Sequence, residues 1–89
     1  MQSTQKVART TNIKWLMFMN ELESKIIGML KVFGDYGLHG IKISINEEDD
    51  IVIEDRSKFI IKTTKLTQDQ FVSMSIKMLI QLVRSMKNG

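Results

Sequence analysis

The sequence predicts an α+β fold of two layers in the order α-β-β-β-α, with a three-stranded antiparallel meander between long N- and C-terminal helices. Three observations carry this prediction. Apolar residues follow a helical period from residue 13 to residue 33, strict apolar–polar alternation begins at Ile41, and a helix-start motif stands at Thr67. At 89 residues the chain has the length of one domain, which we expect over residues 13–89.

Residues 1–12 precede this domain, and their only apolar residues after Met1 are Val7 and Ala8. A segment with so little apolar surface cannot offset the entropy that is lost on ordering. The sequence therefore predicts a flexible N-terminal arm.

The first helix is expected from about Ile13 to Phe33, where apolar residues recur at alternating spacings of four and three. Gly34 and Gly37 follow, and glycine commonly ends a helix because it accepts positive φ. The apolar stripe comprises Trp15, Met19, Leu22, Ile26, Met29 and Phe33.

Three strands are expected at residues 41–45, 51–53 and 58–64, separated by turn-forming residues at 46–50 and 54–57. Short turns between consecutive strands predict an antiparallel meander. The helix-facing side is expected to carry Ile41, Ile43, Ile45, Ile51, Ile53, Phe59 and Ile61, and the open side Lys42, Ser44, Val52, Ile60, Lys62 and Thr64.

The last helix begins at a capping box formed by Thr67 and Gln70, with Leu66 and Phe71 placed for a hydrophobic staple. One helix is expected from there to Gly89. Its apolar positions span an arc of about 240°, more than the stripe of about 100° that packing on one surface requires.

This excess of apolar helix surface predicts a homodimer built by helix–helix contact, because soluble monomers rarely expose large apolar patches and a short chain buries a small core. The alternative is that the two helices pack on each other as well as on the sheet. The expected dimer seam comprises Trp15, Met19, Leu22, Ile26, Met29, Val72, Ile76, Leu79 and Val83.

The residues offer little for catalysis. Without cysteine, thiolate chemistry and disulfides are excluded, and with His39 as the one histidine we do not expect a conventional zinc site. The glycines at 34, 37 and 40 leave a helix and enter a strand, the reverse of the order in a phosphate-binding loop. We expect no enzyme, no catalytic residue, no metal and no cofactor, and a cytoplasmic location.

Charge is unevenly distributed. The carboxylates of Glu47, Glu48, Asp49 and Asp50 lack the spacing of a calcium loop and indicate a solvated hairpin tip. The functional alternatives are weak cation binding and a contact for a basic partner protein. Residues 56–89 carry seven basic residues against Asp69 alone. A basic surface can neutralise phosphates, and the candidate contacts are Lys6, Arg9, Lys58, Lys62, Lys65, Lys77 and Arg84. No exposed aromatic stacking platform is expected.

The order of elements, with the segment Gly37-Leu38-His39-Gly40-Ile41 entering the first strand, resembles the YbaB family of small dimeric nucleoid-associated proteins. The resemblance is one of topology, and it implies a homodimer and a nucleic-acid partner without assigning any residue a role. The acidic stretch at residues 47–55 and the short first helix depart from that family.

The sequence alone favours a small, non-catalytic, homodimeric protein–protein interaction protein of inhibitor or adaptor type, with sequence-nonspecific nucleic-acid binding as the alternative. An anionic membrane surface, reached through Lys14 and residues 15–19, is the least favoured partner. Abundant isoleucine and lysine with a single alanine favour an AT-rich genome, such as that of a low-GC bacterium or its phage.

Overall fold

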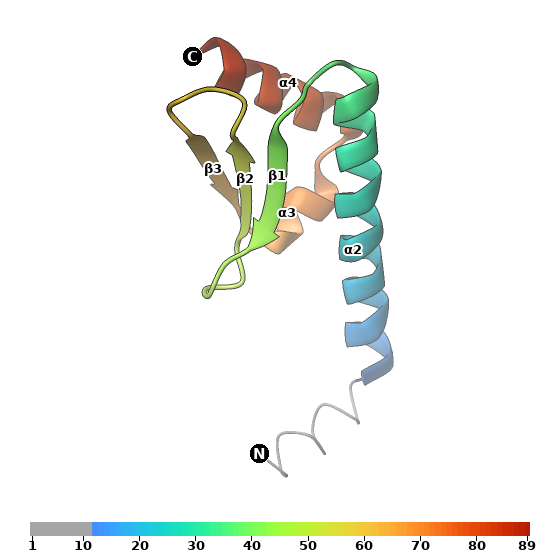
Figure 1. Ribbon diagram of the computed structural model, residues 1–89. Helices are drawn as coiled ribbons and strands as arrows, with labels where there is room; N and C mark the ends of the chain where they lie inside the picture. The colour runs from blue at the N-terminus through green and yellow to red at the C-terminus, as the bar shows by residue number, and fades with distance from the viewer. Residues whose placement is uncertain (1–11) are drawn as a thin grey trace.

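The computed structural model describes the backbone of residues 12–89 and the side chains of residues 20–89. It confirms the α+β class and the predicted order of helix, three strands and C-terminal helical region (Figure 1). The elements are α2 (Asn12–Asp35), β1 (Ile41–Ile45), β2 (Ile51–Asp55), β3 (Lys62–Leu66), α3 (Gln68–Ser73) and α4 (Ile76–Asn88). The predicted N-terminal arm lies outside the described residues, except for Asn12, which begins α2.

The three strands form an antiparallel sheet in the order β1-β2-β3, as the alternation predicts. Ile53 on the central strand pairs with Ile43 on one side and with Thr64 on the other. α2 packs beside β1, α3 against β3, and α4 against β2 and β3, so the helices cover one face of the sheet (Figure 1). The described helices leave the other face open.

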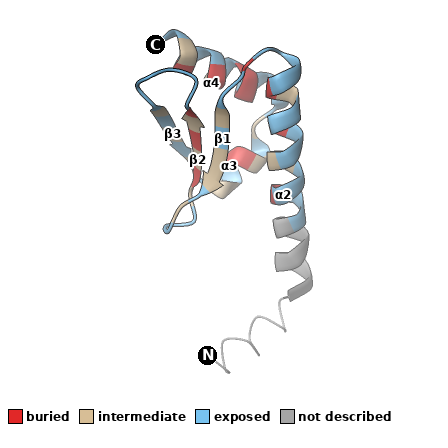
Figure 2. Cartoon of the chain, viewed as in Figure 1, coloured by how far each residue is buried: buried red, intermediate tan, exposed pale blue. Residues whose placement is uncertain are grey.

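The core lies between the sheet and the helices (Figure 2). β2 supplies its centre, because Ile51 and Ile53 point inward at alternate positions and are fully buried. The buried apolar residues are Leu22, Met29, Phe33, Leu38, Ile51, Ile53, Phe71, Leu79, Ile80, Val83 and Met86.

The predicted third strand is wrong in its bounds and in which of its side chains point toward the helices. It was expected at 58–64 with Phe59 and Ile61 inside, but β3 spans Lys62–Leu66, and Leu66 pairs with Ile51. The side chains at 62, 64 and 66 therefore face the helices, because strand side chains alternate and a change of parity exchanges the two faces. The residues displaced from their predicted sides are Phe59, Ile60, Ile61, Lys62 and Thr64.

The predicted single C-terminal helix is interrupted. α3 ends at Ser73, Met74 is extended, and the side chain of Ser75 caps a new helix by accepting a hydrogen bond from the Met78 amide at 3.1 Å. The capping box at Thr67 and Gln70 is confirmed, with its two reciprocal bonds at 2.9 and 3.0 Å. The break lets α3 and α4 take different directions over the sheet.

The connection from α2 to β1 depends on glycine at two places. Gly37 and Gly40 adopt φ values of 73° and 78°, a region that side chains with a Cβ rarely enter. A Cβ on Gly40 would lie 2.8 Å from the Cβ of Ser57, so this connection and the segment after β2 are in direct contact.

Candidate binding surfaces

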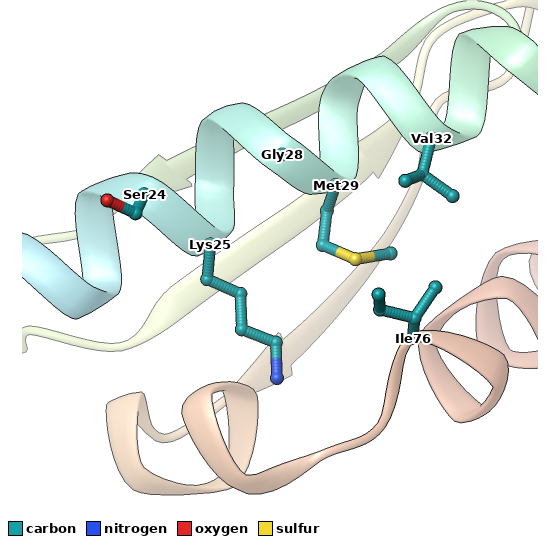
Figure 3. Close-up of a pocket in the computed structure, with 6 residues that line it drawn as sticks. All are labelled: Ser24, Lys25, Gly28, Met29, Val32 and Ile76. Carbon is teal, nitrogen blue, oxygen red and sulfur yellow. The ribbon is translucent and has the colours of Figure 1, made fainter.

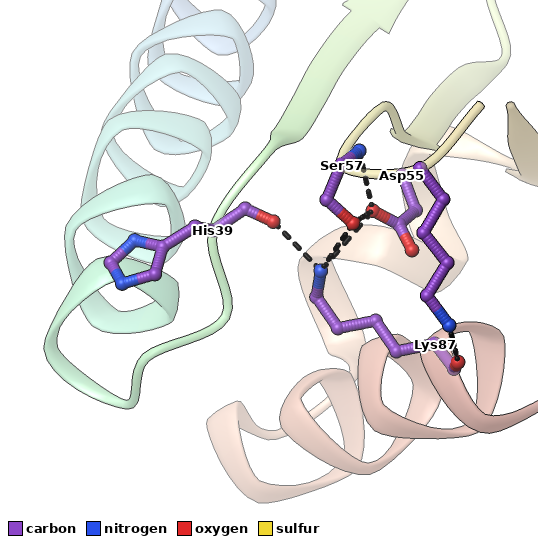
Figure 4. A network of polar contacts seen from close by, with 5 residues as sticks. His39, Asp55, Ser57 and Lys87 are labelled. Atoms are coloured by element: carbon purple, nitrogen blue, oxygen red, sulfur yellow. Dashed lines mark hydrogen bonds and ion pairs between the residues drawn. The ribbon is translucent and has the colours of Figure 1, made fainter.

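A polar cluster, which we call the clasp, joins three distant parts of the chain at the end of β2 (Figure 4). The Lys87 ammonium on α4 donates to the Asp55 carboxylate at 3.2 Å, to the Ser57 hydroxyl at 3.0 Å and to the His39 carbonyl at 2.7 Å. The Ser57 hydroxyl and amide both donate to the same Asp55 oxygen, at 2.6 and 3.1 Å. The clasp therefore fixes the start of the segment that follows β2.

The electrostatics of the clasp fit a structural role. Burial alone would raise the pKa of the Asp55 carboxyl, but hydrogen bonds from Ser57 and the bond and charge of Lys87 outweigh it and hold the pKa below its usual value. Asp55 is therefore an ionised partner for the Lys87 ammonium. His39 contributes its backbone carbonyl, and its side chain is exposed.

Beyond the clasp, three consecutive large apolar side chains face solvent. We call Phe59–Ile61 the apolar loop. Phe59 is 101% exposed, Ile60 72% and Ile61 45%. Contiguous exposed apolar surface is uncommon on monomeric proteins and marks interaction sites. Single apolar side chains on a surface need no explanation, but three in succession on a loop do.

Cations surround the apolar loop. Arg56 and Lys58 precede it and are exposed, and Lys62 follows it at the start of β3. The Lys58 ammonium donates to the Lys87 carbonyl at 3.0 Å, which ties the loop to the last turn of α4. The loop therefore presents an apolar tip in a positively charged setting.

A second surface, the α2 groove, lies between α2 and the start of α4 (Figure 3). It is an open hollow of about 420 Å³ lined by Ser24, Lys25, Gly28, Met29, Val32 and Ile76. The Lys25 ammonium reaches across to α3, where it donates to the Val72 carbonyl at 2.7 Å and to that of Met74. Carbonyls at a helix C-terminus favour a cation, and burial lowers the pKa of Lys25.

A neighbouring hollow of about 490 Å³ shares Ile76 with the α2 groove and continues along α4. Tyr36 and Arg84 stand at its edge, with the guanidinium 5.8 Å from the centre of the aromatic ring. This contact is a cation–π interaction at a largely exposed site, so it contributes about 0.5–1 kcal/mol.

The predicted acidic residues do form a hairpin tip between β1 and β2. The Asn46 side chain orders the turn by accepting hydrogen bonds from the amides of Glu48 and Asp50, both at 2.9 Å. Glu47, Glu48 and Asp49 are exposed, and Asp49 has a φ of 64°. The tip lies at the opposite end of β2 from the apolar loop, so the two surfaces are separate.

The predicted nucleic-acid contacts do not gather into one patch. Lys65 is on the open face of the sheet opposite Val52, whereas Lys77 and Arg84 are exposed on α4 in the helical layer. Lys58 and Lys62 flank the apolar loop. Lys6 and Arg9 lie outside the described residues.

Most of the described residues of the predicted dimer seam contribute to the core of the chain itself. Leu22, Met29, Leu79 and Val83 are buried, and Ile26 and Val72 pack against them. Ile76 remains 54% exposed. The side chains of Trp15 and Met19 lie outside those described.

Several residues of these surfaces escaped sequence reasoning. Asp55, Ser57 and Lys87 are separated by up to 32 residues and form no local motif. The apolar loop was assigned to a strand because Phe59 and Ile61 alternate with other residues. Its run of three apolar residues, which a half-buried strand would not show, was the available signal.

Among residues 12–89, no helix has the length and apolar character needed to cross a membrane. Within the described side chains, no group of three or more His, Asp or Glu residues is placed to hold a metal ion. Comparison of the chain with protein-family models, with curated proteins and with solved structures finds no match.

Proposed function

We propose that this chain is a non-catalytic, homodimeric protein-binding protein of inhibitor or adaptor type, which docks on a partner protein through the apolar loop. The observation that carries the proposal is the complete exposure of Phe59 next to Ile60 and Ile61. A buried aromatic anchor is a typical hot spot of a protein–protein interface.

The clasp supports this function because it holds the base of the loop before any partner binds. Asp55 is 2% exposed and Ser57 is bonded to it through two donors. A segment that is already ordered at its base loses less conformational entropy on binding, which favours affinity.

Charge indicates the chemistry of the partner surface. Arg56, Lys58 and Lys62 flank the apolar tip, and Asp55, the carboxylate that precedes it most closely in the chain, is already paired with Lys87. A complementary surface is an apolar pocket with an acidic rim, because matched potentials favour association and reject wrong partners. The acidic hairpin lies too far along β2 to belong to this site, and its role as a contact stays a separate prediction.

One observation favours a second function, the binding of single-stranded nucleic acid. Phe59 is exposed beside Lys58 and Lys62, and an aromatic ring between cations can stack a base while the cations contact phosphates. Against it, the rest of the tip is Ile60 and Ile61, whose aliphatic side chains suit a protein pocket better than a base.

The test places a photoreactive phenylalanine analogue at position 59 or, as a matched aromatic control, at position 36. After irradiation in lysate of the source cells, we expect a discrete protein adduct from position 59 that is absent from position 36. The variant Phe59→Ser/Ile60→Ser should remove binding of the partner so identified, with a free energy of unfolding changed by less than about 0.5 kcal/mol because both side chains face solvent.

A parallel measurement of fluorescence anisotropy with labelled single-stranded DNA, at about 50 and about 200 mM salt, tests the second function. Micromolar binding that weakens with salt and is lost in the Phe59→Ser/Ile60→Ser variant would replace the protein-binding proposal. Loss of folding in that variant would show instead that the loop is structural.

A further inference from the structure

The α2 groove and the hollow beside it form one continuous trough, because Ile76 lines both of them. On α2 the lining extends from Ser24 to Tyr36, a rise of about 18 Å along the helix axis. On α4 it extends from Ile76 to Arg84. The trough, as we call the two hollows together, therefore has two helices as its walls and the length of about three helical turns.

The floor of the trough is apolar. Figure 3 shows the side chains of Met29 and Val32 on α2 pointing toward Ile76 on α4. Met29 belongs to the core, whereas Ile76, at the junction of the two hollows, remains 54% exposed. An exposed aliphatic side chain in a concave apolar setting is a contact point for the apolar side chains of a partner.

Gly28 leaves the α2 wall of the trough bare. A Cβ at this position would contact no other part of the chain within 4 Å. Glycine is among the least favourable residues in the interior of a helix, so the core packing of this chain does not account for its presence. Where glycine stands on a surface, another backbone or a large side chain can approach closely. The wall is therefore shaped for a close contact that the chain itself does not make.

Positive charge stands along the α4 side of the trough. Lys77 and Arg84 are exposed, and neither forms an ion pair with any residue whose side chain the structure describes. Lys25, on the α2 side, is not available in the same way, because the carbonyls of Val72 and Met74 hold its ammonium. None of the residues that line the trough carries a carboxylate.

We propose that the trough binds an acidic amphipathic helix of a partner protein, whose apolar side chains contact Met29, Val32 and Ile76 and whose carboxylates contact Lys77 and Arg84. The trough shares no residue with the apolar loop. It therefore gives the chain a second docking surface, which does not depend on the proposed function.

The walls and the charge of the trough select this occupant. An extended peptide has backbone N–H and C=O groups that need partners, and walls made of helices offer no strand edge for pairing. A helix satisfies its own backbone groups and presents apolar side chains at spacings of three and four. The cations of Lys77 and Arg84 attract carboxylates and repel a basic helix, so the occupant is acidic.

Selection from a display library of random peptides of about 16 residues tests the occupant without assuming its sequence. The parent chain is the target and Gly28→Met the counter-target, because the methionine side chain can extend into the trough without a clash at its Cβ. We expect peptides that are rich in Asp and Glu, repeat apolar residues at spacings of three and four, and bind the parent at least about tenfold more tightly than Gly28→Met.

The matched control is Gly34→Met, because a Cβ at Gly34 is equally free of contacts and Gly34 does not line the trough. This variant should bind the peptides as the parent chain does. Circular dichroism should show both glycine variants folded.

Fluorescence anisotropy with the tightest of these peptides tests the charge. Lys77→Glu/Arg84→Glu should weaken binding by about tenfold or more, because it replaces attraction by repulsion at the trough. The matched control is Lys42→Glu/Lys65→Glu, which makes the same change of net charge with two exposed lysines on the open face of the sheet. This control should weaken binding by less than about threefold, through long-range charge alone.

Acidic peptides of helical spacing that lose binding in Gly28→Met and in Lys77→Glu/Arg84→Glu support the inference. Basic peptides, peptides without that spacing, or a selection in which none distinguishes the parent from Gly28→Met overturn it. A parent chain that is a dimer by sedimentation velocity and is dissociated by Gly28→Met also overturns it, because a second copy then occupies the trough. Phe59→Ser/Ile60→Ser should bind the peptides normally, so the proposed function is tested separately.

Discussion

At the scale of single residues, the carboxylate of Asp55 shows how a buried charge is stabilised in a small core. It is 2% exposed and accepts hydrogen bonds from two groups of Ser57 and from Lys87. These donors outweigh the cost of burial and lower its pKa. A buried pair is costly to break because the remaining charge loses its partner.

We predict that Asp55→Asn destabilises the chain by about 1–3 kcal/mol at neutral pH. The folded-state pKa lies below the unfolded value, so the stability contributed by Asp55 is complete above about pH 5 and is lost as pH falls toward the folded pKa. In urea unfolding at several pH values, the gap between parent and variant should therefore shrink with acidification. Glu47→Gln, an exposed carboxylate variant, controls for loss of charge. A gap that is constant with pH would contradict this account.

Gly40 is a second residue whose identity is fixed by its surroundings. Its φ is 78°, and a Cβ would meet the Cβ, Cα and amide nitrogen of Ser57 at 2.8–2.9 Å. Gly37 has a similar φ of 73° but open space around it. We predict that Gly37→Ala costs about 1–2 kcal/mol from backbone strain alone, and that Gly40→Ala costs at least about 1 kcal/mol more. Urea unfolding measures both, and equal losses would show that the contact with Ser57 is easily relieved.

At the scale of elements, local motifs were easier to predict than their registers. The capping box at Thr67 was found because it is formed by four consecutive residues. The cap at Ser75 was missed because apolar residues continue at helical spacing on both sides of it. The predicted bounds of β3 were wrong because both the odd-numbered and the even-numbered residues of 58–66 include apolar side chains. Alternation therefore did not show which set faces the helices. The contact of Gly40 with Ser57 joins two segments that are distant in sequence, so no local motif could predict it.

The break between α3 and α4 makes a prediction for the Ser75 cap. Ser75→Ala removes the acceptor of the Met78 amide and should cost about 1 kcal/mol, whereas Ser75→Asp should retain most of the stability. Ser85→Ala, an exposed serine within α4, is the control for general effects of the substitution. If Ser75→Ala raised the helix content by circular dichroism without loss of stability, α3 and α4 would be merging and the cap would be dispensable.

At the scale of the whole molecule, the sequence predicted class, order and strand pairing but not the surfaces. Class follows from periodicity, which each element carries within itself. Exposure depends on which elements meet. Phe59 was predicted to lie in the core because it is hydrophobic. Leu79 and Val83 were predicted to lie in a dimer seam because they belong to the wide apolar arc of the last helix. In the structure Phe59 is exposed, whereas Leu79 and Val83 are buried within the chain, because α4 uses these residues to cover one face of the sheet.

The clasp also bears on the order of events in folding. Lys87 meets its acceptors across 30, 32 and 48 residues of chain, whereas β1 and β2 pair across one short turn. Contacts between residues so distant in sequence form late, after local helices and hairpins. Interactions absent from the transition state govern the rate of unfolding more than the rate of folding. We therefore expect the clasp to govern the rate of unfolding, and with it the time for which each folded molecule keeps Phe59 exposed.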